Sequence, residues 1–234
     1  MIVAYYSNTG ESRRIAEYLG KKLGWETVDI LKTHIREYDR MILVFPVYCQ
    51  GIPKRVEKFL GSVKIQNLIP IATYGKMSYG DVLRQMQDKF PHKIVSAAYV
   101  PTKHTYSDEE RFSEFEKLGE IIENIYGDEE IKIPRSKKSF WADMLSEERS
   151  RMGVKIIRTD RCTSCGVCTE NCPENAVING ITGKNCIRCL RCVENCPGKA
   201  LEYRLIYPMK KYLSKVRCSD IVIYTASGIV YKKI

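Results

Sequence analysis

Residues 1–12, MIVAYYSNTGES, place a short apolar run directly before a loop of hydroxyl side chains and a glycine. The run Met1–Tyr6 predicts a buried strand. The next segment, Glu11–Leu23, carries Ile15 and Leu19 on one face and therefore predicts an amphipathic helix. A strand followed at once by a helix is the repeating unit of an α/β domain.

The same alternation continues to about residue 126. Apolar runs predict the strands Thr27–Leu31, Arg40–Phe45, Leu68–Thr73 and Lys93–Val100. The predicted helices are Pro53–Leu60, Asp81–Phe90 and Ser107–Tyr126, the last with a capping box of Ser107 and Glu110. Only about eight residues separate the second and third strands, so we expect an abbreviated connection there. Five strands with intervening helices predict a doubly wound five-stranded parallel sheet.

The loop after the first strand is the first candidate binding site. It consists of Ser7, Asn8, Thr9, Gly10, Glu11 and Ser12. At a helix N-terminus, backbone N–H groups, hydroxyls and the helix dipole attract an anion. The loop lacks the lysine of a P-loop and the spaced glycines of a dinucleotide fingerprint, which favours a monoester phosphate. A simple helix cap would also use serine and threonine.

This loop resembles the phosphate loop of flavodoxins, and it lies where flavodoxin-like folds bind FMN. The resemblance implies two further loops around the flavin ring. They contribute the candidates Pro46, Val47, Tyr48, Gly51, Thr73, Tyr74 and Gly75. Tyr48 and Tyr74 are candidates for ring contact, because aromatic rings stack on flat ligands, although both could be ordinary loop tyrosines. We expect Cys49 and Cys218 to be packing residues and His104 to be an exposed loop residue.

Eight of the ten cysteines form one motif stated twice. The motifs are Cys162-x2-Cys165-x2-Cys168-x3-Cys172-Pro173 and Cys186-x2-Cys189-x2-Cys192-x3-Cys196-Pro197. This spacing is typical of bacterial ferredoxins with two [4Fe–4S] clusters, in which the fourth cysteine of each motif serves the other cluster. Zinc is the alternative, but zinc sites usually take their cysteines in two pairs.

The crossed spacing predicts two ligand sets. One cluster takes Cys162, Cys165, Cys168 and Cys196, and the other takes Cys186, Cys189, Cys192 and Cys172. Four basic residues, Lys184, Arg188, Arg191 and Lys199, accompany the second motif. Positive charge near a cluster raises its reduction potential, so the Cys186 cluster is predicted to be the more oxidising, unless these side chains point to solvent.

The whole chain resembles the flavodoxin-like/ferredoxin fusion family, the EFR-type ferredoxins. The resemblance implies a flavodoxin-like FMN domain at 1–127, a linker at 128–154, a small α+β ferredoxin domain at 155–205 and a C-terminal extension at 206–234. Within the linker, Trp141–Met152 predicts a short helix. Within the extension, Ile221–Thr225 and Ile229–Tyr231 have strand character. Where relatives carry a Pro-x-Asn-Tyr-like stretch, this chain reads Pro101-Thr102-Lys103-His104.

These observations predict an iron–sulfur flavoprotein, an oxidoreductase that passes electrons between FMN and two [4Fe–4S] clusters. No general acid or base is legible, so no catalytic residue is named. The alternatives are a ferredoxin-type carrier that docks to larger redox enzymes, and a ferredoxin whose N-terminal domain is only a scaffold. The formal net charge of +10 falls to about +4 when two clusters of about −2 each and a flavin phosphate of about −2 are counted. This basic bias favours an acidic redox partner protein, beside a small-molecule donor or acceptor. No nucleic-acid motif, membrane span or signal peptide is evident, and we expect a cytoplasmic protein.

Overall fold

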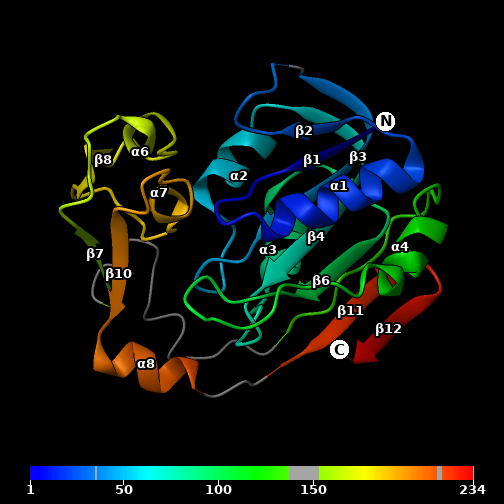
Figure 1. Ribbon diagram of the computed structural model, residues 1–234. Coiled ribbons are helices and arrows are strands. Elements are labelled where there is room, and N and C mark those ends of the chain that lie inside the picture. The colour runs from blue at the N-terminus through cyan, green and yellow to red at the C-terminus, as the bar shows by residue number, and fades with distance from the viewer. Residues whose placement is uncertain (35, 137–152, 215–217, 234) are drawn as a thin grey trace.

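The computed structural model describes residues 1–34, 36–136, 153–214 and 218–233. Its main element is a sheet of eight strands in the order β12-β11-β6-β4-β3-β1-β2, with β5 paired to β4 (Figure 1). The strands from the N-terminal half are β1 (Ile2–Tyr5), β2 (Thr27–Asp29), β3 (Glu37–Pro46), β4 (Lys64–Tyr74), β5 (Lys93–Ile94) and β6 (Ala97–Pro101). Strands β2, β1, β3, β4 and β6 run parallel in that order, which confirms the predicted doubly wound sheet. The predicted strand 93–100 is divided into β5 and β6.

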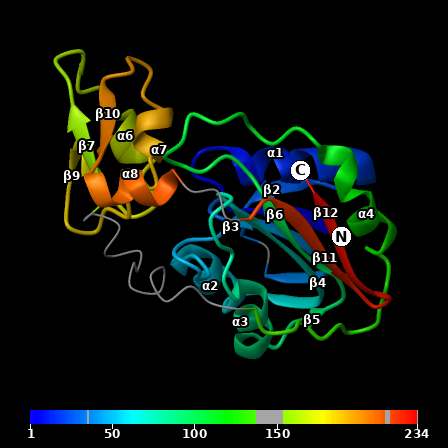
Figure 2. The ribbon, with the colours of Figure 1, turned by 90° about the horizontal axis from the view of Figure 1, so that it is seen from below.

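Helices cover both faces of this sheet (Figure 2). Helices α1 (Glu11–Leu23) and α4 (Gly119–Glu123) lie on one face, and α2 (Lys54–Leu60) and α3 (Val82–Lys89) lie on the other. Alternate residues of β3 face opposite sides: Met41 belongs to the core under α2 and α3, whereas Ile42 belongs to the core under α1 and α4. Both faces of β3 are therefore buried in apolar cores, which explains why its sequence is continuously apolar rather than alternating.

The C-terminal residues return to the sheet. Strands β11 (Asp220–Thr225) and β12 (Gly228–Lys233) form an antiparallel hairpin, as the strand character of this segment predicted. Strand β11 pairs antiparallel with β6, and the Tyr74 hydroxyl donates to the Asp220 carbonyl over 2.7 Å. Residues 1–136 and 218–233 together are called the sheet domain below.

Residues 153–205, called the cysteine module below, form a small α+β unit between the two parts of the sheet domain. Its strands are β7 (Val154–Arg158), β8 (Val177–Ile178), β9 (Ile181–Thr182) and β10 (Leu201–Leu205), and its helices are α6 (Val167–Glu170) and α7 (Arg191–Glu194). Strand β10 pairs antiparallel with β7 along its whole length. Helix α8 (Tyr207–Leu213) follows the module. None of the helices in the described ranges is long and apolar enough to cross a bilayer.

The predicted long helix 107–126 is wrong over its first half. The structure has only a 3-10 turn, η1 (Phe115–Leu118), and then α4. Ser107 donates its hydroxyl to the His104 carbonyl instead of capping a helix. Phe112 is buried against α1, and its N–H donates to Glu11 Oε2, so tertiary contacts override the local helix preference. The predicted helix Trp141–Met152 lies outside the described residues.

Candidate functional site

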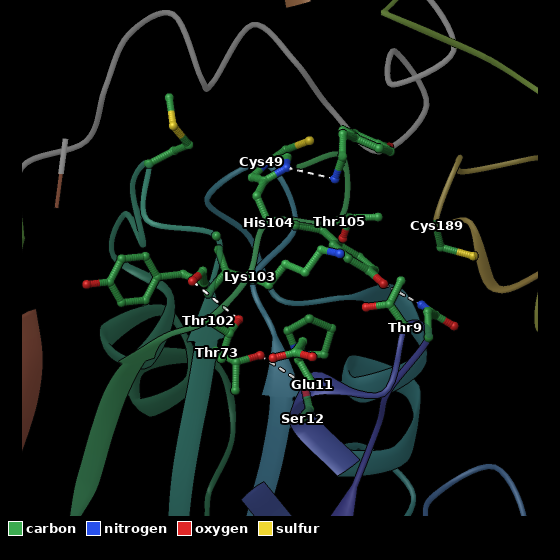
Figure 3. A pocket seen from close by; sticks show the side chains of 18 of the residues that line it. Thr9, Glu11, Ser12, Cys49, Thr73, Thr102, Lys103, His104, Thr105 and Cys189 are labelled. Atoms are coloured by element: carbon green, nitrogen blue, oxygen red, sulfur yellow. Dashed lines mark hydrogen bonds between the residues drawn. The ribbon is translucent and has the colours of Figure 1, made fainter. Parts of the chain in front are cut away.

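A large cavity lies at the carboxyl edge of the parallel sheet (Figure 3). It is near the end of β1, which pairs with β2 on one side and with β3 on the other. It encloses about 1200 Å³, the space at its open mouth included. All of the predicted flavin-site residues except Gly10 and Gly51 line it: Ser7, Asn8, Thr9, Glu11, Ser12, Pro46, Val47, Tyr48, Thr73, Tyr74 and Gly75. The fold therefore gathers the three predicted loops around one space, because the carboxyl ends of parallel strands meet at one edge.

The loop after β1 is held in shape by its own side chains. The Gly10 N–H donates to Ser7 Oγ over 3.1 Å, and Gly10 has a φ of 95°, which a glycine adopts without strain. The Ser12 and Thr73 hydroxyls lie 2.8 Å apart, which links the first turn of α1 to the end of β4 (Figure 3). Ser12 and Thr73 thus line the cavity together with the start of α1.

Asn8 connects this loop to the loop after β3. Its amide nitrogen donates to the hydroxyls of Tyr6 and Tyr48. Its side-chain oxygen is buried and has no hydrogen-bond partner within the described part of the chain. Next to Tyr48, Cys49 is exposed, so the prediction that Cys49 is a packing residue is wrong. Cys218, in contrast, packs against the sheet core.

Tyr74 and His104 both line the cavity. The Tyr74 ring is buried, and its hydroxyl donates to the Asp220 carbonyl of β11. His104 is half-buried and lines the cavity, so the prediction of an exposed loop histidine is wrong. Burial lowers the pKa of His104 to about 4, which keeps the imidazole neutral at pH 7. His104 accepts the Tyr106 N–H at Nδ1 over 3.1 Å.

Glu11 is the one carboxylate of the predicted phosphate loop, and its charge is balanced within the chain. Burial raises the pKa of Glu11, while Arg14 and Arg111 lower it. Arg111 Nε lies 3.5 Å from Glu11 Oε1, and Arg14 lies 3.9 Å from it. Because an ionised carboxylate only accepts hydrogen bonds, Glu11 would meet a phosphate through its backbone N–H at the start of α1.

Sequence reasoning missed most of the loop after β6. Thr102, Lys103, Thr105 and Tyr106 line the cavity together with His104 (Figure 3). The signal was present, since this loop follows the fifth parallel strand and must emerge at the same edge of the sheet. Lys103 brings a positive charge that also lowers the pKa of Glu11. The site therefore has a cation that the hydroxyl-rich loop alone did not predict.

Two smaller cavities lie among the cysteines. The first, of about 370 Å³ with its opening, is lined by Cys162, Cys165, Cys168 and Cys196. The second, of about 300 Å³ with its opening, is lined by Cys172, Cys186, Cys189 and Cys192. Each set joins three cysteines of one motif to the fourth of the other. We call them the first and the second cysteine site.

The backbone repeats along with the cysteines. Ser164 and Arg188, which occupy equivalent positions in the two motifs, have φ values of 57° and 59°. The fourth cysteines accept equivalent hydrogen bonds, from the Ala176 N–H to Cys172 Sγ and from the Ala200 N–H to Cys196 Sγ, each over 3.2 Å. The doubled motif is therefore two copies of one loop–helix unit.

Comparison with known families separates the chain into the same parts. A model of the flavodoxin domain matches residues 2–75, and a model of the 4Fe-4S binding domain matches residues 155–178. The chain therefore joins a flavodoxin domain to a 4Fe-4S binding domain. The sheet domain is called the flavodoxin domain below, and the cysteine module is called the ferredoxin domain. A flavodoxin domain joined to a 4Fe–4S domain makes it an electron-transfer protein of the flavin and iron–sulfur type.

Two solved structures are similar to part of this chain at low sequence identity. One is a putative flavoprotein from Bacteroides uniformis ATCC 8492, with 16% identity, coverage of 52% of this chain and 96% of that one, and a TM-score of 0.42. The other is the Trp repressor binding protein from Bacillus subtilis, with 16% identity, coverage of 58% and 100%, and a TM-score of 0.32. No curated protein matches the chain.

The residues of the flavodoxin domain fit an FMN. The Asn8 side-chain oxygen lacks a hydrogen-bond partner among the described residues, and the cavity is lined by hydroxyls, the first residues of α1 and Lys103. Gly75 allows the loop after β6 to approach closely, since an added Cβ would lie 2.9 Å from the His104 Cα and closer to its ring. The cavity thus offers polar partners for a phosphate.

The residues of the ferredoxin domain fit iron–sulfur clusters. Soft thiolates surround each small cavity, and four-cysteine sites favour iron–sulfur clusters or zinc. Among the described residues, no three His, Cys, Asp or Glu side chains gather as a single metal ion requires. A four-iron cube spaces its ligands more widely than one ion does. Its four cysteines must therefore surround a cavity, as each of the two sets does.

Replacing Gly75 by alanine is expected to weaken FMN binding. The added methyl group has no room beside the His104 backbone, so the loop after β6 must shift. Overpacking of this kind costs about 1–3 kcal/mol, and at the low end the Kd for FMN rises about fivefold. Fluorescence titration of apoprotein with FMN measures this. Gly119→Ala is the control, because an added Cβ there meets nothing within 4 Å, and equal affinities for both variants would contradict the prediction.

Proposed function

We propose that this protein binds one FMN and two [4Fe–4S] clusters and converts between two-electron and one-electron transfer. FMN exchanges one or two electrons, and each cluster exchanges one. A chain that holds all three can therefore accept an electron pair on one side and release single electrons on the other. The proposed role is that of a redox converter in the cytoplasm, where free cysteines stay reduced.

One observation carries this proposal: the flavin cavity and the second cysteine site share a wall. Ile187 and Cys189, from the second cysteine motif, line the same cavity as the flavodoxin loops. Cys189 also lines the cavity between the four cysteines of the second site. This adjacency supports electron exchange between a flavin and a cluster, and it favours a converter over a ferredoxin with an unrelated scaffold.

The proposed binding residues are those that the sequence singled out. Thr9, Ser12 and the first N–H groups of α1 would hold the phosphate, and Lys103 would add a positive charge. The Tyr48 side chain would approach the ring from the loop after β3. Each cysteine site would hold one cluster with its own four thiolates.

Charges near the second cysteine site support a higher potential for its cluster. Arg191 lines that cavity, and one guanidinium nitrogen each of Arg188 and Arg191 is buried without a hydrogen-bond partner in the described structure. Positive charge held close to a cluster stabilises its reduced state. Lys184 and Lys199 are exposed, so solvent screens their charges.

The proposed partner is an acidic one-electron carrier protein, with a small molecule as donor or acceptor at the flavin. The positive net charge, which is +10 for the chain and about +4 with the proposed cofactors counted, supports an acidic partner through electrostatic steering. Rates of reduction by such a carrier should therefore fall as ionic strength rises.

An anaerobic spectroelectrochemical titration of the reconstituted protein tests the proposed function. We expect about one FMN and about eight iron atoms per chain, with flavin and cluster signals that titrate in overlapping potential windows. Iron without bound flavin would contradict the proposal and would leave a ferredoxin on a flavodoxin-like scaffold.

A further inference from the structure

Two sets of side-chain contacts join the flavodoxin domain to the ferredoxin domain. On α2 of the flavodoxin domain, Arg55 forms an ion pair with Glu174, with 3.0 Å between Nε and Oε1. The Arg55 guanidinium also donates to the Pro173 carbonyl. Pro173 and Glu174 directly follow Cys172, so Arg55 contacts the chain beside one cysteine of the second site.

The second contact comes from the loop after β6. The Tyr106 hydroxyl donates to the Arg188 carbonyl over 2.7 Å. The Tyr106 ring also lies against Tyr203 of β10, with 6.0 Å between ring centroids. Arg188 immediately precedes Cys189, so this hydrogen bond holds another cysteine segment of the second site.

Equivalent cysteines of the two motifs differ in their exposure to solvent. The two motifs have equivalent backbones, but their cysteines are covered differently. Cys165 is exposed, whereas its counterpart Cys189 is half-buried and lines the flavin cavity. Cys162 is half-buried, whereas its counterpart Cys186 is buried. The flavodoxin domain therefore covers the second site and leaves the first site open.

The surroundings of the first site are apolar and basic at the surface. Ile178 and Ile181, on the β8–β9 hairpin, are 68% and 66% exposed. Asn179, between them, lines the cavity of the first site. Arg161 lines the same cavity, and its side chain is 57% exposed.

On the basis of the proposed function, we infer that Arg55 and Tyr106 are positioning residues that dock the second cysteine site onto the flavin cavity of the same chain. The first cysteine site then remains the one open to solvent. This assigns an order to the three cofactor sites within one chain: the flavin cavity, the second site, and the first site at the surface. Each of them acts by holding the two domains together.

Hydrogen–deuterium exchange of the anaerobic holoprotein tests this docking. We compare wild type with Tyr106→Phe, Arg55→Gln and the double variant, and follow peptides that span residues 183–190 and 172–176. Loss of one hydrogen bond should raise exchange of the adjoining peptide about fivefold, and the double variant should raise both by more than either single change. Arg84→Gln is the control, since its ion pair with Asp88 lies within α3 of the flavodoxin domain and Arg84 lines none of the three cavities. Unchanged exchange in the double variant would overturn the inference.

Two further readouts separate this inference from the proposed function. Flavin and iron contents of the same wild-type sample report whether the cofactors bind at all, and a deficit there counts against the proposed function alone. Full cofactor content with unchanged exchange counts against the docking alone. The exchange difference should not depend on protein concentration, whereas a difference that vanishes on dilution would show contact between chains and would also overturn the inference.

Discussion

Replacing Cys162 and Cys196 together by alanine is expected to remove one [4Fe–4S] cluster and to leave the other intact. Both side chains line the first cysteine site, although they come from different motifs. Replacing Cys162 and Cys172 together is expected to damage both clusters, because Cys172 lines the second site. The two double variants lose the same number of thiolates, so the comparison isolates the pairing of the motifs.

Electron paramagnetic resonance of the reduced variants measures the outcome. The Cys162→Ala/Cys196→Ala protein should give one [4Fe–4S] signal with about one spin per chain and about four iron atoms. The Cys162→Ala/Cys172→Ala protein should give no intact [4Fe–4S] signal. The reverse result would mean that each motif keeps its own fourth cysteine. Because metal binding stabilises small domains, the flavin content of each variant serves as the control that the flavodoxin domain remains folded.

The parallel sheet was predictable because its determinants are local. Runs such as 41–45 are apolar at every position, and they can be buried on both faces only within a covered parallel sheet. The hairpin β11–β12 was predictable as strands but not as part of this sheet. Its place depends on pairing with β6 across the inserted ferredoxin domain, and no local pattern encodes such a distant partner.

The candidate site shows the same division between local and distant determinants. The cysteine sets and the loop 7–12 follow from spacing and from position after a strand, so the sequence identified them. The helix predicted around Phe112 is wrong, because the local helix preference is weaker than burial of Phe112 against α1 and its contact with Glu11. Met209 and Tyr212 of α8 line the flavin cavity only because the ferredoxin domain is docked there, which sequence spacing cannot express.

Replacing Thr9 and Ser12 together by alanine is expected to release FMN while the iron content stays unchanged. Both residues line the phosphate end of the proposed flavin site, and Ser12 is held toward the cavity edge by its hydrogen bond with Thr73. A hydrogen bond to a charged group contributes about 1.5–3 kcal/mol. Loss of two such bonds should raise the Kd for FMN by at least about a hundredfold, whereas the cysteine sites lie in another domain and keep their thiolates.

Flavin and iron contents of the purified variant measure this difference directly. Ser62→Ala is the control, because that hydroxyl donates to the Phe59 carbonyl at the end of α2, outside the cavity lining. Riboflavin gives a second comparison, since it has no phosphate: its affinity should change little in the double variant, whereas that of FMN should fall. Equal losses for both ligands would mean that the substitutions disturb the ring pocket through the Ser12–Thr73 contact. Unchanged FMN content would mean that the phosphate binds elsewhere, and the assignment of the loop 7–12 would be wrong.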